Sequence, residues 1–132
     1  MIRFLKTKQI KRTWGLEKIL TDTDKYLGKI NFYKAGFAGG LQYHTEKDET
    51  FHILSGEGWL DYDIGSGNRE LIRIKIYPGD TIHIPPLTVH RIEAITDLTG
   101  IEFSTVHFED RVRVEEHYGV EVIGEKGLPS TW

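Results

Sequence analysis

The sequence of 132 residues contains no cysteine, which excludes disulfide bonds and thiolate metal ligands. A metal site in this chain would therefore need nitrogen and oxygen donors from His, Gln, Asp or Glu. The chain also lacks an apolar run near the ~18 residues that a membrane span needs. No apolar segment typical of a secretory signal follows the first lysines. We therefore expect a cytoplasmic protein with no membrane partner.

Convincing amphipathic helical patterns are missing as well. Turn residues recur about every 8–12 positions, which is typical of an all-β sandwich or barrel. We expect one domain over residues 1–132, with an N-terminal arm or edge strand in 1–20 and a charged C-terminal tail in 106–132. Within the arm, we expect an entering strand at Ile2–Leu5 and a turn at Trp14–Leu20. Alternating apolar residues predict further strands at 26–34, 59–64, 71–77, 81–84, 89–94 and 98–105.

The N-terminal segment is basic, although the whole chain has a formal net charge of −3. A basic segment of this kind can contact nucleic acid. No aromatic interleaving and no nucleic-acid-binding motif accompany it, so lysines that guard an exposed edge strand explain it better. We expect no nucleic-acid partner.

Polar side chains able to hold a metal ion gather between residues 36 and 58. Gln42 and His44 lie two residues apart, so both side chains point to one face of a strand. Glu49 opens the next apolar run after a polar turn, and we expect it to face them across a hairpin. His90, after a proline-rich turn, supplies a fourth donor. With no soft ligand in the set, a divalent Zn, Mn, Fe, Co or Ni ion is expected.

These two stretches resemble the paired motifs of the cupin superfamily. The first motif reads Gly, five residues, His-x-His, three or four residues, Glu, six residues, Gly. The chain follows it from Gly36 to Gly56, with Gln42 in the first His position. The second motif ends in a proline-bearing turn and a His, here Pro85 and His90, with Leu87 where the family usually has Gly. The resemblance implies a small RmlC-like jelly-roll β-barrel, also called a double-stranded β-helix, and a homodimer.

A narrower resemblance concerns segments outside the two motifs. Four segments are similar to small single-domain cupins related to mannose-6-phosphate isomerase. They are Tyr26–Lys29, Lys47–Phe51, Glu102–Thr105 and, at the end of the likeness, Tyr118–Gly119. Such domains occur alone or at the C-terminal end of mannose-1-phosphate guanylyltransferases. The likeness spans roughly residues 14–119 and implies a small carbohydrate as the substrate.

Three further residues are candidates for chemistry at this site. Glu102 interrupts an apolar strand, and if it faces the cavity it is a candidate general base. His83 lies in the strand before His90, where it could act as a catalytic proton shuttle or cap the sheet. Lys29 faces inward if strand alternation holds, and could then bind a carboxylate or phosphate group of the substrate.

The leading functional hypothesis is a metal-dependent isomerase or epimerase acting on a sugar or sugar phosphate. The substrate class in this hypothesis is implied by the resemblance. An Fe(II)-dependent dioxygenase is the first alternative, because His44, Glu49 and His90 form a two-His-one-carboxylate set. The neutral amide of Gln42 counts against it. A non-catalytic, metal-bearing module that binds or senses carbohydrate is the second alternative.

Overall fold

The computed structural model describes residues 1–120, which form eleven strands and one short helix. Their bounds in chain order are β1 (Lys8–Arg12), β2 (Gly15–Asp22), β3 (Leu27–Tyr33), β4 (Gln42–His44), β5 (Glu49–Ser55), β6 (Gly58–Asp63), β7 (Leu71–Ile76), β8 (Thr81–Ile84), β9 (His90–Ala94), β10 (Leu98–Ser104), β11 (Arg111–Arg113) and α1 (Glu115–Tyr118).

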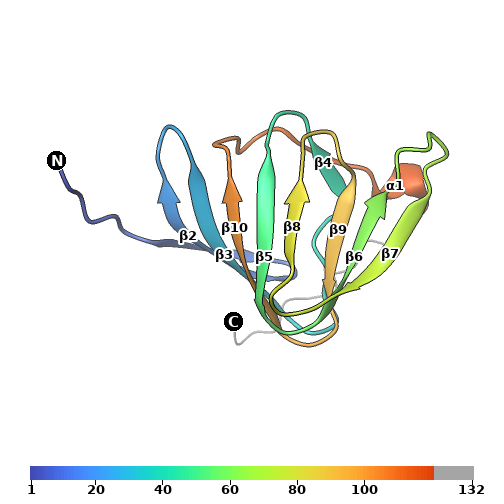
Figure 1. The fold of residues 1–132 in the computed structure, drawn as a ribbon, viewed down its shortest axis with the longest axis horizontal. Helices are drawn as coiled ribbons and strands as arrows, with labels where there is room; N and C mark the ends of the chain where they lie inside the picture. Colours follow the sequence, from blue (N-terminus) through green and yellow to red (C-terminus); the bar gives the residue numbers. More distant parts are fainter. Residues whose placement is uncertain (121–132) are drawn as a thin grey trace.

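The strands make two antiparallel sheets that face each other. One has six strands in the order β1-β2-β3-β10-β5-β8, and the other has five in the order β11-β4-β9-β6-β7. Strands that follow one another along the chain often lie in opposite sheets, as β8 and β9 do. Figure 1 shows β8 next to its sheet partner β5, and β9 next to β6. This arrangement confirms the predicted all-β jelly roll.

Alternation along the strands decides which side chains enter the barrel. On β5, Glu49, Phe51 and Ile53 are buried, whereas the intervening side chains are more exposed. On the neighbouring strand β10, a Cβ atom added to Gly100 would lie 2.0 Å from the Phe51 ring, so this strand requires glycine there. The apolar core that results is made of Trp14, Tyr33, Phe51, Ile53, Leu60, Ile76, Ile92, Ala94 and Leu98.

The expected hairpin between Gln42–His44 and Glu49 is wrong. β4 belongs to the five-stranded sheet and β5 to the six-stranded sheet, so residues 45–48 cross from one sheet to the other. Gln42 is instead paired with His90 of β9. Glu49 therefore faces the other predicted donors from the opposite wall of the barrel.

The β8–β9 turn places a leucine in the left-handed backbone region. Leu87 has a φ of 64°, a conformation that glycine adopts without steric cost. Its N–H donates a hydrogen bond of 2.7 Å to the carbonyl oxygen of His44, which ties the turn to β4. The turn therefore keeps its shape although the usual glycine is absent.

The two ends of the chain differ from the prediction. Ile2–Leu5 is not a strand; the edge strand is β1, and β2 replaces the turn expected at Trp14–Leu20. β1 and β2 pair antiparallel around Thr13 and Trp14, and the Trp14 ring stacks on Tyr33 with centroids 4.2 Å apart. In the charged tail the structure shows β11 and α1, while positions 121–132 lie outside the described residues. None of the helices within residues 1–120 has the length and apolarity that crossing a membrane requires.

Candidate functional site

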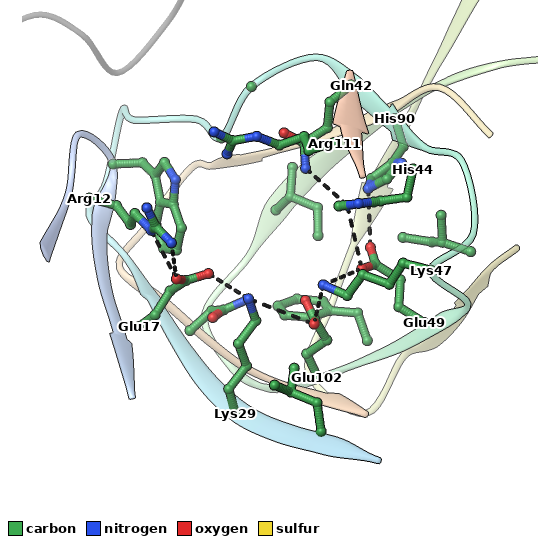
Figure 2. A pocket seen from close by; sticks show the side chains of 18 of the residues that line it. Arg12, Glu17, Lys29, Gln42, His44, Lys47, Glu49, His90, Glu102 and Arg111 are labelled. Atoms are coloured by element: carbon green, nitrogen blue, oxygen red, sulfur yellow. Dashed lines mark hydrogen bonds and ion pairs between the residues drawn. The ribbon is translucent and has the colours of Figure 1, made fainter. Parts of the chain in front are cut away.

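A cavity of about 260 Å³ lies between the two sheets. Figure 2 shows charged and polar side chains entering it from both walls. Its volume falls just below the ~300–1,000 Å³ typical of small-molecule sites. Six of the seven residues that the sequence singled out line it, namely Lys29, Gln42, His44, Glu49, His90 and Glu102.

The four predicted metal donors converge in this cavity. His90 Nε2 lies 3.2 Å from Glu49 Oε1, and His44 Nε2 lies 4.0 Å from Glu49 Oε2. Gln42 Nε2 is 3.5 Å from His44 Nε2. His44, Glu49 and His90 are each less than a tenth exposed. The prediction that these side chains share one site therefore agrees with their placement.

The far ring nitrogens of both histidines are held by hydrogen-bond acceptors. His44 Nδ1 is 3.0 Å from Asp110 Oδ1, and His90 Nδ1 is 2.9 Å from the carbonyl oxygen of Thr88. A carboxylate and a carbonyl accept only, so each Nδ1 carries the proton and donates it. With Nδ1 donating to the protein, Nε2 is the ring atom that each histidine presents to the cavity, which is the orientation that metal-ligating histidines adopt.

Burial and neighbouring charges set the protonation of this group. Burial by itself would raise the pKa of Glu49, but the hydrogen bond from His90 and the charge of Lys47 lower it to about 2. Burial lowers the pKa of His44, which favours the neutral ring. Burial also opposes ionisation of Asp110, but two backbone N–H groups and His44 lower its pKa to about 2. An ionised Glu49 is the form that binds a divalent cation, and a proton held on the Nε2 atom of either imidazole would be released when that nitrogen binds the ion.

Two observations bear on whether these residues fit a metal ion. The Oε1 atom of Gln42 is buried and lacks a hydrogen-bond partner within residues 1–120, as expected for an oxygen that awaits a ligand. Two ligands that share an ion at roughly 2.1 Å lie at most about 4.2 Å apart. The separations from Glu49 to His90 and His44, 3.2 and 4.0 Å, stay within that limit. The donor set therefore fits a divalent ion chemically.

The side chains as placed are not yet a ready-made metal site. Within residues 1–120, no three His, Asp or Glu side chains have an arrangement that would hold an ion. The ammonium of Lys47 lies 3.2 Å from Glu49 Oε2 and neutralises the carboxylate. An ion that uses this oxygen must displace Lys47.

A chain of alternating charges crosses the cavity, and sequence reasoning missed most of it. Neighbouring members are separated by 2.6 to 3.7 Å, and most are buried. Lys47 had been predicted to lie in a polar turn, yet it is 6% exposed. We call this set the charge ladder, and in order it consists of Arg12, Glu17, Lys29, Glu102, Lys47 and Glu49.

The two predicted catalytic side chains, Glu102 and His83, lie on opposite faces of the six-stranded sheet. Glu102 is buried and faces the cavity, where it lies 2.7 Å from Lys47 Nζ and 3.7 Å from Lys29 Nζ. The assignment of His83 as a catalytic residue is wrong, because its side chain is 61% exposed on the outer face of β8 and contacts Asp48. Its neighbours Ile82 and Ile84 occupy the inward positions.

The C-terminal tail contributes two further residues to the site. Asp110 holds His44, as described above, and Arg111 lines the cavity. The β11 register places Arg111 opposite His44 and Arg113 opposite Gln42. The alternation of Arg111, Val112 and Arg113 was a signal of a strand, but nothing local showed that the strand would pair with β4.

A protein-family model described as the cupin domain matches residues 30–106, which is more than half of the chain. The chain belongs to the cupin family. No curated protein matches the sequence of this cupin. The narrower likeness to mannose-6-phosphate isomerase therefore stays a prediction.

Solved structures similar to this cupin share its fold. The capsular polysaccharide assembling protein CapF from Staphylococcus aureus aligns with a TM-score of 0.71 and 22% identity, over 82% of this chain and 34% of CapF. KdgF from Halomonas sp. aligns with a TM-score of 0.60 and 18% identity, over 72% of this chain and 81% of KdgF. Oxalate decarboxylase from Lactobacillus farciminis gives 0.68 and 14%, over 84% and 34% respectively. This cupin thus spans about a third of the length of CapF.

Proposed function

We propose that this cupin is a metal-dependent enzyme that removes a proton from the carbon beside a carbonyl group of a small sugar or sugar phosphate. An isomerase returns the proton to the neighbouring carbon, and an epimerase returns it to the same carbon. The observation that supports this most directly is the presence of the Glu102 carboxylate in the same cavity as the four metal donors. Such chemistry needs a Lewis-acidic ion and a base that can accept a proton from carbon.

The cavity residues divide this work between them. The four donors hold a divalent ion, which when bound polarises a carbonyl group of the substrate. Glu102 accepts the proton from the carbon beside that carbonyl, and in an isomerase it returns the proton to the neighbouring carbon. The 2.7 Å contact with Lys47 fixes the position of the Glu102 carboxylate.

The carbohydrate class has weaker support than the chemistry. It draws on the likeness of several segments to small carbohydrate-associated cupins, and on CapF, which assembles a capsular polysaccharide. A cavity of about 260 Å³ restricts the substrate to a small molecule.

Elemental analysis of the full chain, purified without added metal, tests the metal site. We expect about one divalent ion per chain in the wild type, lost in His90→Ala because one imidazole ligand is gone. His83→Ala is the matched control, since it removes an imidazole from the outer surface. Absence of metal in the wild type would contradict the proposal, and iron with oxygen consumption would favour the dioxygenase.

Proton transfer itself can be followed by solvent exchange. Metal-loaded protein is incubated in D₂O with a panel of aldose and ketose phosphates, and deuterium entering the carbon beside the carbonyl is measured by NMR. We expect Glu102→Gln to lower the exchange rate by roughly 100-fold or more, because the base is lost. His83→Gln should exchange at the wild-type rate.

A second candidate function follows from the ion pair between Lys47 and Glu49. An ammonium 3.2 Å from the carboxylate can neutralise it without a metal ion. In that case the chain is a non-catalytic module that binds carbohydrate in the cavity. It predicts a sugar ligand whose affinity is the same in wild type and Glu102→Gln, with no deuterium exchange in either.

We also propose that the chain forms a homodimer through its N-terminal arm. Ile2 and Phe4 are 91% and 99% exposed, and the N-terminal segment before β1 extends away from the barrel (Figure 1). Apolar side chains this exposed are stabilised when a second copy covers them. A monomeric mass in solution at micromolar concentration would contradict this.

A further inference from the structure

We propose that the cavity selects a hydroxylated anion, whose negative group binds Arg111 and one of whose hydroxyl groups binds Asn31. The ligand class is thus a sugar acid or a sugar phosphate, and a neutral sugar is rejected. The inference deepens the proposed function and rests on it for placing the reacting carbons beside the metal donors. The recognition groups themselves come from two separate observations.

The first observation is that Arg111 has no counterion among residues 1–120. Within residues 1–120, the other Lys and Arg side chains that line the cavity are all paired. On the same face of β11, Arg113 is paired with Glu115. No hydrogen bond or ion pair holds Arg111 in the described part of the chain. A guanidinium binds a carboxylate or phosphate through two parallel N–H bonds, so Arg111 is suited to receive an anion.

The position of Arg111 matches this role. Figure 2 shows it on the same side of the cavity as Gln42 and His90, across from Lys29 and Glu102. An anion bound to Arg111 therefore lies on the metal-donor side, with the rest of the ligand extending toward Glu102. The Lys29 ammonium, which the sequence suggested for this role, is held 2.6 Å from Glu17 Oε1.

The second observation is a buried carboxamide without a partner. Asn31 is 4% exposed and lines the cavity from β3, yet its Oδ1 atom has no hydrogen bond within residues 1–120. Buried polar atoms in proteins nearly always have a partner, and leaving one unpaired is costly. A hydroxyl group both donates and accepts, so it can bind the carboxamide in either orientation. Asn31 therefore marks the place of a ligand hydroxyl.

The overall charge of the cavity agrees with an anionic ligand. Five Lys and Arg side chains line it against three Glu side chains. A divalent ion at the four donors would increase this positive excess. A neutral sugar would leave Arg111 unpaired, whereas a singly or doubly charged ligand compensates it.

Isothermal titration calorimetry on the metal-free full chain tests the inference with three probes: glucuronate, mannose 6-phosphate and mannose. We expect the two anions to bind and mannose to bind at least about 10-fold more weakly, because it lacks a charge-assisted hydrogen bond to Arg111. The tighter of the two anions identifies whether the ligand carries a carboxylate or a phosphate. Mannose bound as tightly as both anions, or no binding by any probe, would overturn the proposal.

Variants separate the two contacts. Arg111→Met should weaken the anions about 10- to 100-fold and leave mannose unchanged, while Arg3→Met in the exposed arm should change nothing. Asn31→Leu should weaken all three probes about 10-fold, with Asn68→Leu in the β6–β7 loop as its control. Asn31→Ala replaces Asn31→Leu if the larger side chain lowers the melting temperature. Wild-type affinity in Arg111→Met contradicts the proposal, whichever result Asn31 gives.

Failure of the proposed function leaves a different signature. If the wild type binds anionic sugars through Arg111 but carries no metal and exchanges no deuterium, the inference stands and the enzyme proposal falls. If metal and exchange are present but Arg111→Met exchanges like the wild type at limiting substrate, the inference falls and the enzyme proposal stands.

Discussion

The two walls of the cavity are chemically different. On the six-stranded sheet, Glu17, Lys29, Glu49 and Glu102 belong to the charge ladder, in which each charge has an opposite charge beside it. On the five-stranded sheet, the cavity groups include two imidazoles, the Gln42 carboxamide and the Arg111 guanidinium. Within residues 1–120, the Gln42 oxygen has no hydrogen bond and Arg111 has no ion pair. Among residues 1–120, the charges of the first wall are thus paired within the protein, whereas the second wall keeps polar groups that have no partner.

Because of this difference, substitutions on the two walls should affect different properties of the protein, namely its stability and its affinity for ligands. Removing a member of the ladder leaves a buried charge uncompensated, so the cost appears in the free energy of unfolding. Removing a group from the five-stranded wall deletes a contact that the protein alone does not use, so the cost appears in the affinity for metal or substrate. Variants of the ladder members Arg12, Glu17 and Lys47 should therefore fail in stability assays, and variants on the five-stranded wall in binding assays. Glu49 and Glu102 belong to the ladder and also act on metal or substrate, so their variants should fail in both.

The largest effect is expected for Lys47→Met. Without this ammonium, Glu49 and Glu102 are left buried with one counterion fewer, which should lower the free energy of unfolding by about 3–5 kcal/mol. Urea denaturation monitored by tryptophan fluorescence measures it. The control is Lys34→Met, which breaks an ion pair with the exposed Asp97 and should cost at most about 1 kcal/mol. Equal losses in the two variants would show that the ladder adds no stability.

Asp110→Asn should produce the next largest effect, in metal affinity. Asp110 holds His44 Nδ1 at 3.0 Å, and loss of such a partner typically lowers metal affinity about 10- to 100-fold. The exposed pair of His83 and Asp48 has a similar contact of 2.7 Å, so Asp48→Asn is the matched control and should leave affinity unchanged. Competition with a chromogenic chelator gives both values. An unchanged affinity in Asp110→Asn would mean that His44 does not ligate.

The ladder also predicts a pH dependence of stability. Burial opposes ionisation of Glu17, but Lys29 and Arg12 outweigh it and lower the pKa of Glu17 below 4.5. A lowered folded-state pKa stabilises the protein above the unfolded value and loses that contribution as the pH falls through the folded value. The stability advantage of wild type over Glu17→Gln should therefore shrink as the pH falls from neutral through 4.5 and then through the lowered pKa of Glu17, as urea denaturation at a series of pH values would show. An advantage that grows on acidification would refute the assignment.

Local patterns in the sequence predicted the elements well. The alternating segments around β3, β6, β7, β9 and β10 are strands at nearly the expected bounds, because alternation and turn residues act over a few positions. His83 was open to the same reasoning: with Ile82 and Ile84 directed inward, an intervening residue must point outward. Strand alternation likewise places Glu102 inward, between the more exposed residues Ile101 and Phe103.

Contacts between segments that are distant in the sequence could not be predicted from local patterns. Lys47 looks like a turn residue, and its burial depends on two carboxylates from separate strands. Arg111 and Asp110 belong to a charged tail whose pairing with β4 no local pattern reveals. The four metal donors were predicted from the spacing of the cupin motifs, although the predicted hairpin between Gln42–His44 and Glu49 was wrong. Pairing partners across a barrel are set by topology, which short-range periodicity does not encode.

The smallest effect is expected at Leu87, where the chain departs from its family. A non-glycine residue at a φ of 64° carries about 1–2 kcal/mol of steric strain, and glycine costs about 0.5–1 kcal/mol in chain entropy. Because the Leu87 side chain is 69% exposed, Leu87→Gly should raise the free energy of unfolding by up to about 1 kcal/mol. Leu54→Gly, in the extended β5, should lower it by about 1 kcal/mol in the same denaturation assay. A loss at Leu87 would instead mean that its side chain is covered in solution, as a second copy of the chain would do.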